Sequence, residues 1–139
     1  MIGGNCMKTW GSNQKSITLS SGEAELVAAV KVSCEVIGIC QLASDWGIEL
    51  GAKVWIDSSA ALGVVGRKGN GKLRHVRVGM LWIQEKVEEG ELEVRKVPGE
   101  DNPADLMTKY LTRKVMDHHM GAINQVEVEG RAKMSLKSE

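Results

Sequence analysis

Three acidic residues of this sequence lie where separate predicted secondary-structure elements begin or end. Glu25 lies in the opening turns of a long helix, Asp57 follows an apolar strand, and Asp105 lies in a short helix. Carboxylates that converge from separate elements suit Mg²⁺, a hard cation that prefers oxygen ligands and usually retains water and phosphate oxygens. The three residues are therefore candidate metal ligands, and the elements that carry them decide whether they meet.

The helix that carries Glu25 is predicted from a capping motif and from apolar periodicity. Ser20 is followed three residues later by Glu23, which matches the capping box at a helix N-terminus. Apolar residues then recur at roughly helical spacing between Leu26 and Trp46. We therefore expect one long helix with a buried stripe, in which the macrodipole alone could also favour an acid at Glu25.

Asp57 follows the continuous apolar run 54–56 and precedes a stretch of serines and alanines. An apolar strand that leads into a helix predicts an α/β sheet whose strand is covered on both faces. Asp57 could be the N-cap of that helix, a role worth about 1 kcal/mol without any chemistry. Its place at the carboxyl end of a strand, where α/β sheets carry their sites, favours a functional role, and the two roles are compatible.

Asp105 lies in a predicted short helix over 104–109, with Asn102 as its cap and Pro103 at its first position. An acid at the third helical position is often structural, so this residue has the weakest physical support of the three. Before Glu25 we predict a hairpin over 6–10 and 16–19. Between Asp57 and Asp105 we predict an amphipathic helix over 76–87 that Gly90 closes, followed by a half-exposed strand over 91–95. This pattern belongs to the α/β class.

Composition limits the kinds of partner. The 139 residues are 42% hydrophobic and 26% charged, as expected for one globular domain. Lysine plus arginine equals aspartate plus glutamate at 18 each, so no net charge attracts a polyanion and any nucleic-acid contact needs a local patch. The acid-free stretch 67–77 is that patch, either as a solvated loop or as a phosphate-binding surface. Its basic residues are Arg67, Lys68, Lys72, Arg74 and Arg77, together with His75.

Several other residues and segments lead to structural expectations. The three cysteines lack close CxxC pairing, which fits buried thiols in a reducing compartment. We find no apolar run of about 18 residues and no targeting signal, so we expect an intracellular chain, cytoplasmic or nuclear, without a membrane span. Trp46 and Trp55 are expected in the core, His118 and His119 at the surface, and His75 receives no catalytic role.

Four sequence blocks together resemble a known family. LSSGEAELVAAVK, KVWIDSSAALGVV, KLRHVRVGMLWIQEKVEEGELEVRKVP and EDNPADLMTKYL resemble, in order, successive blocks of the ribonuclease H domain of copia-type retrotransposons, and the resemblance covers residues 3–115. It implies a ribonuclease H-like mixed sheet with flanking helices. It also implies that Glu25, Asp57 and Asp105 are catalytic metal ligands.

The sequence departs from this family at its front. No Asp or Glu occurs before Glu23, whereas the family's first strand carries an Asp, and GGNCMKTW resembles the second strand. We therefore expect an incomplete domain over 3–115 that lacks the first strand, followed by a polar tail over 116–139, partly disordered. An absent central strand would leave backbone groups unpaired, so an upstream reverse transcriptase segment or another chain is expected to complete the sheet.

The resemblance implies hydrolysis of the RNA strand of an RNA:DNA hybrid with two Mg²⁺ ions about 4 Å apart. Selectivity would come from contacts to 2′-hydroxyl groups. Without the missing Asp, we expect weak metal binding and little cleavage by this chain alone. Two alternatives stay open: an inactive retrotransposon-derived remnant that binds nucleic acid or acts as a structural subunit, and an α/β interaction domain held in a larger assembly.

Overall fold

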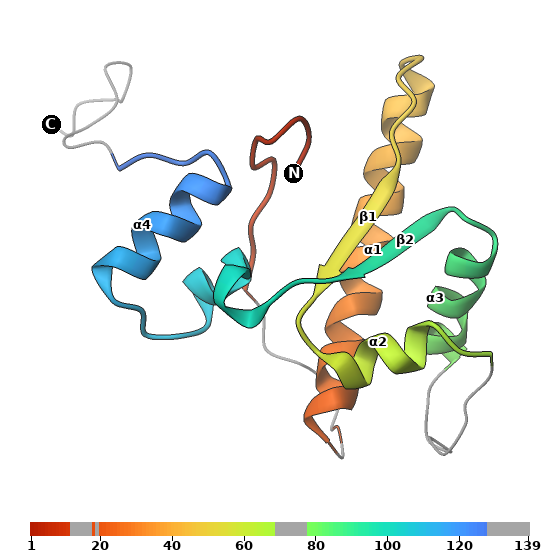
Figure 1. The fold of residues 1–139 in the computed structure, drawn as a ribbon. Helices are drawn as coiled ribbons and strands as arrows, with labels where there is room; N and C mark the ends of the chain where they lie inside the picture. Colours follow the sequence, from red (N-terminus) through yellow and green to blue (C-terminus); the bar gives the residue numbers. More distant parts are fainter. Residues whose placement is uncertain (12–17, 19, 69–77, 128–139) are drawn as a thin grey trace, which may run out of the picture. The chain divides into compact units, whose positions relative to one another are not determined.

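The computed structural model describes residues 1–11, 18, 20–68 and 78–127, which form helices and one small sheet (Figure 1). The chain divides into two compact units, Asn13–Asn102 and Met1–Ser12 with Pro103–Glu139. The elements are α1 (Ser21–Asp45), β1 (Ala52–Ile56), α2 (Ser59–Val65), α3 (Val78–Glu88), β2 (Leu92–Lys96), the 3₁₀ helices η1 (Gly99–Asp101) and η2 (Pro103–Met107), and α4 (Arg113–Ala122).

Helix α1 begins at the predicted cap and ends where the predicted apolar stripe ends. The Ser20 hydroxyl accepts a hydrogen bond of 3.2 Å from the backbone N–H of Glu23, which confirms the predicted N-cap. Gly47 has a φ of +76°, a left-handed conformation that costs glycine little, and it follows the last turn of the helix. The predicted long helix is therefore confirmed.

Helix α1 is long and apolar enough, by length and composition, to cross a membrane. No such run was expected from the sequence. Core helices of globular domains share this composition, and Leu26 and Ala29 of α1 are buried in the core of the unit Asn13–Asn102. Only 22% of its apolar window is buried, so packing accounts for part of this composition, and a single such helix is consistent with a chain without a membrane span.

The sheet consists of β1 and β2, which pair in parallel from Ala52 opposite Leu92 to Ile56 opposite Lys96. Helix α1 runs beside β1 (Figure 1), and alternate β1 residues Ala52, Val54 and Ile56 are buried. The α/β class is thus confirmed. The described residues form only this two-stranded sheet, so the larger mixed sheet stays a prediction.

The opposite face of β1 corrects two expectations about strand burial and tryptophan packing. Trp55 is 53% exposed and Trp46, at the end of α1, is 72% exposed, so neither is a core residue. The Arg95 guanidinium lies over the Trp55 ring, 5.5 Å from its centroid, and Arg95 also pairs with Glu93. Within the described residues, strand β1 is therefore covered on the face of Ala52, Val54 and Ile56, whereas Trp55 contacts Arg95 of β2 and solvent.

Apolar side chains from five elements form the core of the unit Asn13–Asn102. Helix α1 supplies two residues, and the strands with α2 and α3 supply the rest. This core holds the N-terminal half of α1 against β1 and α2, and these are the elements that carry Glu25 and Asp57. Its buried members are Leu26, Ala29, Ala52, Val54, Ile56, Ala61, Val65, Ile83 and Leu92.

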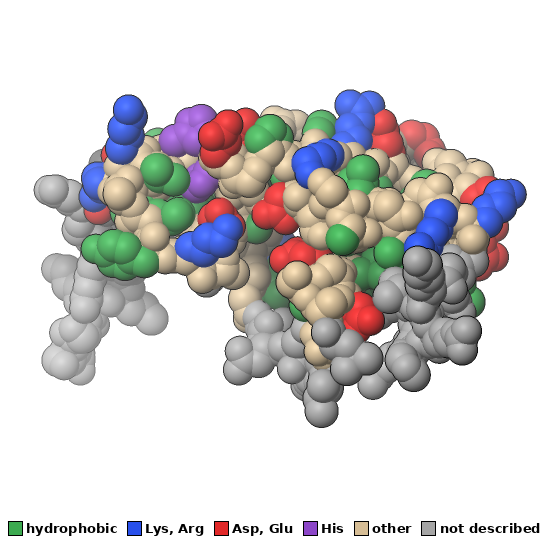
Figure 2. All heavy atoms as spheres, turned by 60° about the horizontal axis from the view of Figure 1, so that its bottom comes forward, with side chains coloured by type: hydrophobic (Ala, Val, Ile, Leu, Met, Phe, Trp, Pro, Cys, Tyr) green, Lys and Arg blue, Asp and Glu red, His purple; other side chains and the backbone are tan. Residues whose placement is uncertain are grey.

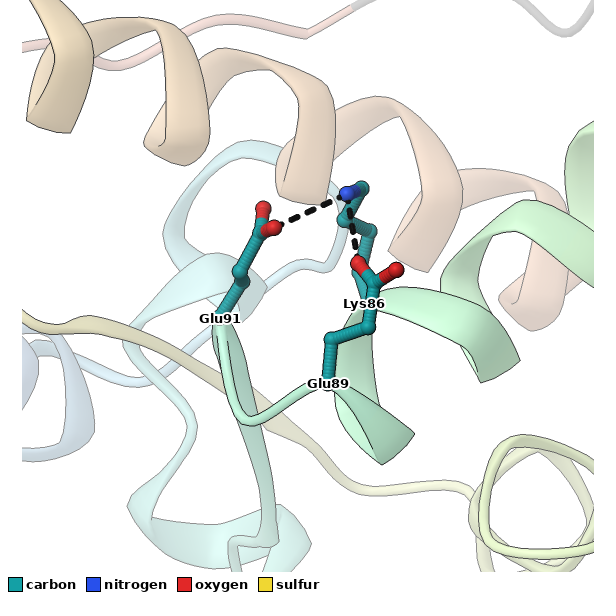
Figure 3. Close-up of polar contacts among 3 residues, drawn as sticks. All are labelled: Lys86, Glu89 and Glu91. Carbon is teal, nitrogen blue, oxygen red and sulfur yellow. Dashed lines mark hydrogen bonds and ion pairs between the residues drawn. The ribbon is translucent and has the colours of Figure 1, made fainter.

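An ionic cluster stabilises the turn between α3 and β2 (Figure 3). The Lys86 ammonium donates to Glu89 Oε2 at 2.7 Å and to Glu91 Oε1 at 3.1 Å. These hydrogen bonds raise the pKa of Lys86 above its ordinary value, and Lys86 lowers the pKa of Glu89. Gly90, at a φ of +77°, closes the turn as predicted.

The other unit departs most from the sequence predictions. Residues 6–10 form no strand, so the first arm of the predicted hairpin is wrong, and most of its second arm lies outside the described residues. The predicted short helix is η2, a 3₁₀ helix over Pro103–Met107. Helix α4 was not predicted, and it spans residue 115, the predicted end of the domain. His119 of α4 is 1% exposed, contrary to the surface position expected for it.

The cysteines also differ from expectation. All three are free thiols, Cys34 is exposed, and Cys6 and Cys40 are half-buried, so none is the buried thiol that the sequence analysis predicted.

Candidate active site at the end of strand β1

Asp57 lies directly after β1, where three segments of the unit Asn13–Asn102 meet. The side-chain amide of Asn102 donates a hydrogen bond of 3.3 Å to Asp57 Oδ2. The Lys96 ammonium, at the end of β2, donates to the backbone carbonyl of Asp57 at 3.4 Å and to the hydroxyl of Ser59. The half-buried carboxylate is thus held at the carboxyl end of a parallel strand pair, where α/β sheets bind ligands.

The N-cap of α2 is Ser58 and not Asp57. The Ser58 hydroxyl accepts a hydrogen bond of 3.1 Å from the backbone N–H of Ala61. The alternative that explained Asp57 as a helix cap is therefore wrong. The carboxylate of Asp57 is not used to satisfy the helix backbone, which strengthens the case for a role in chemistry.

This assignment predicts different effects for two adjacent substitutions. We expect Ser58→Ala to lower the free energy of unfolding by about 1 kcal/mol, because it removes the cap of α2. We expect Asp57→Asn to change it by less than about 0.5 kcal/mol, as for a substitution away from a cap or the core. Urea denaturation followed by circular dichroism measures both, and a larger loss for Asp57→Asn than for Ser58→Ala would contradict the assignment.

Glu25 is exposed on α1, within the first turns after the Ser20 cap. Helix α1 approaches α2 closely at this end, because a Cβ placed on Gly22 would lie 3.1 Å from the Cβ of Ala60. The segment that carries Glu25 therefore packs beside the helix that follows Asp57. Glycine at position 22 permits this approach.

Asp105 lies in η2, in the unit that does not contain Glu25 and Asp57. Its side chain is 13% exposed. The Oδ2 atom of Asp105 forms an ion pair of 2.9 Å with the ammonium of Lys109, four residues later. This ion pair gives Asp105 a structural role within η2, as the structural interpretation of the sequence allowed. A metal ion that binds Asp105 Oδ2 would have to compete with the Lys109 ammonium.

The donor chemistry of the three residues fits Mg²⁺, because all are carboxylates. Their grouping does not complete a site: within the described parts of the chain, no three His, Cys, Asp or Glu side chains are close enough to hold a metal ion. The structure places Asp57 half-buried directly after β1 and leaves the three-carboxylate set as a prediction.

The predicted basic patch is only partly described. Arg67 and Lys68 follow α2, and Lys68 forms an exposed ion pair with Glu88, which raises the pKa of Lys68. Lys72, Arg74 and Arg77, with His75, lie outside the described residues. On the face that Figure 2 shows, basic and acidic side chains are interspersed, so the described residues add no broad basic surface there.

Lys96 and Asn102 beside Asp57 were not identified from the sequence. Asn102 was interpreted only as a helix cap, and Lys96 belongs to no recognised sequence motif. The signal for Lys96 is positional: because β1 and β2 are parallel and Ile56 pairs with Lys96, both strands end at the same edge. That pairing is not visible in the sequence.

Comparison with known proteins finds similarity to polyproteins of plant transposons. It is 32% identical over 108 residues, 76% of its length, to the retrovirus-related Pol polyprotein from transposon TNT 1-94 of Nicotiana tabacum. It is 28% identical over 124 residues, 86% of its length, to those from transposons RE2 and RE1 of Arabidopsis thaliana. The homologues are transposon Pol polyproteins.

This similarity supports a retrotransposon-derived segment. The chain spans about 8% of the length of each of these polyproteins. No protein-family model and no solved structure matches the chain.

Proposed function

We propose that this chain is the ribonuclease H segment of a copia-type retrotransposon Pol polyprotein. In the complete domain, Glu25, Asp57 and Asp105 serve the hydrolysis of the RNA strand of an RNA:DNA hybrid. The observation that carries the proposal is the Asp57 carboxylate, which lies at the carboxyl end of β1 with its helix already capped by Ser58. The transposon homologues support the same origin.

In this proposal the three carboxylates hold Mg²⁺, which supplies charge to activate the attacking water and to stabilise the leaving oxygen. The chain's own residues set the conditions for this. Asp57 presents a carboxylate that Asn102 already orients, and Glu25 extends from the capped end of α1. The Lys109 ammonium and Mg²⁺ would compete for the carboxylate of Asp105.

A further strand is part of the proposal. Among the described residues, β1 pairs with β2 on one edge and no strand pairs with its other edge. Open edges of parallel strands are normally paired or covered. We propose that a strand bearing the fourth carboxylate occupies this edge and that it comes from an upstream reverse transcriptase segment or from another chain.

The experiment compares this chain with a longer one, extended by the segment that precedes the matched region in the tobacco polyprotein. Both are incubated with Mg²⁺ and an RNA:DNA hybrid labelled on the RNA strand. We expect the longer chain to cleave the RNA and this chain to cleave little or none. Ca²⁺ in place of Mg²⁺ and a DNA:DNA duplex are the controls.

Two results would contradict the proposal. If the longer chain does not cleave the hybrid, the enzyme interpretation fails. If it binds the hybrid without cleavage, and salt weakens that binding steeply, the alternative of an inactive nucleic-acid-binding remnant is supported.

A further inference from the structure

We propose that Asn102 is a positioning residue that orients the carboxylate of Asp57 for metal binding. The inference rests on the proposed function, in which Asp57 is a metal ligand. From the sequence, Asn102 was interpreted only as a helix cap before Pro103.

The backbone of Asn102, which carries the donor of this hydrogen bond, is restrained by its neighbours. Asn102 ends η1, and its backbone N–H donates to the carbonyl of Gly99 at 3.3 Å. Pro103 follows it, and a residue before proline is restricted to extended conformations, as its φ of −85° and ψ of 103° show. The backbone of Asn102 is thus held from both sides, so its amide can hold Asp57 Oδ2 at 3.3 Å in one orientation.

The chemistry of an amide suits this task. An amide N–H donates to one carboxylate oxygen without neutralising the negative charge that a cation needs. The ion pair between Asp105 and Lys109 is the contrasting case, because its ammonium opposes a metal ion with a positive charge of its own. Carboxylates that bind metals are commonly held by such hydrogen bonds, and losing one typically costs 10-fold to 100-fold in metal affinity or activity.

A purely structural role for Asn102 would make a different prediction. If its hydrogen bond served only to fasten η1 to the end of β1, its loss would lower stability and leave the Asp57 side chain in its original rotamer. A positioning role requires that the rotamer distribution of Asp57 itself changes. The rotamer is therefore the quantity to measure.

The test is made on this chain by NMR, without metal or substrate. Three-bond couplings between Hα and Hβ of Asp57 report its χ1 populations. We expect one dominant rotamer in the unchanged chain and averaging over at least two in Asn102→Leu, which keeps the shape of the side chain and removes the donor. Asn5→Leu is the matched control. The side chain of Asn5 also takes part in an amide hydrogen bond, with Asn124, and both residues lie in the unit that does not contain Asp57.

A second readout is the dissociation constant of the longer chain for Mn²⁺, because this chain alone is expected to bind metal weakly. We expect this constant to rise about 10-fold in Asn102→Leu and to stay unchanged in Asn5→Leu. Unaltered Asp57 couplings in Asn102→Leu would overturn the inference, as would an altered rotamer with unaltered Mn²⁺ affinity. If the longer chain binds no Mn²⁺ with or without the substitution, that result counts against the proposed function, while the couplings in this chain still decide the role of Asn102.

One further measurement applies if Asn102→Leu does not fold. With Asn102 left in place, Asp57→Leu removes both side-chain oxygens that can accept the bond. It should then shift the side-chain amide resonances of Asn102 more than those of Asn5. Equal shifts would show that the hydrogen bond does not form in solution.

Discussion

Asp57→Asn is expected to lower the rate of hybrid cleavage by the longer chain at least about 100-fold. The substitution keeps the shape of the side chain and removes the charge that would hold Mg²⁺ at the end of β1. A bound metal ion contributes several kcal/mol of charge stabilisation in the transition state, and each 1.4 kcal/mol corresponds to a factor of ten in rate. Initial rates at saturating Mg²⁺ and hybrid measure the loss.

Asp45→Asn is the matched control for this experiment. Asp45 is exposed and is the last residue of α1, so the same chemical change there should leave the rate within about twofold. Because Ser58 caps α2, Asp57→Asn should also leave the unfolding transition unchanged, and a loss of activity cannot then be attributed to unfolding. Equal rates for Asp57→Asn and the unchanged chain would show that Asp57 is not a ligand.

Elements with strong local signals were predictable from the sequence. The Ser20 cap, the Gly90 that closes the turn after α3, and the apolar run of β1 each act within a few residues, and the structure contains all of these elements. Helix α4 (RKVMDHHMGA) was not predicted because half of its residues are charged or histidine, although its apolar residues Val115, Met116 and Met120 lie at helical spacing. Its burial of His119 depends on tertiary packing, which residue types alone do not specify.

The errors within the site have two physical origins. Asp57 and Ser58 are both good capping residues, and the point at which β1 stops determines which one caps α2. The apolar run 54–56 resembled a strand buried on both faces, but Trp55 faces solvent and contacts Arg95. By contrast, the pairing of Asp105 with Lys109 could have been predicted, because residues four apart on a helical segment are neighbours.

Leu26→Ala is expected to lower the free energy of unfolding by about 2 to 5 kcal/mol, the usual range for removing a large apolar side chain from a core. Leu26 is 0% exposed and packs among residues from β1, α2 and α3. Typical domains have only about 5 to 15 kcal/mol of stability, so this change could unfold much of the population. Urea denaturation followed by circular dichroism measures it.

Leu42→Ala provides the comparison within the same helix. Leu42 is 51% exposed, so its truncation should change stability by no more than about 0.5 kcal/mol. Equal, small losses for the two variants would contradict the packing of α1 against the sheet. Because Leu26 follows Glu25 directly, its burial also fixes the turn that presents Glu25. Conditions under which Leu26→Ala stays folded should therefore still reveal weaker Mn²⁺ binding than Leu42→Ala shows, if Glu25 is a ligand.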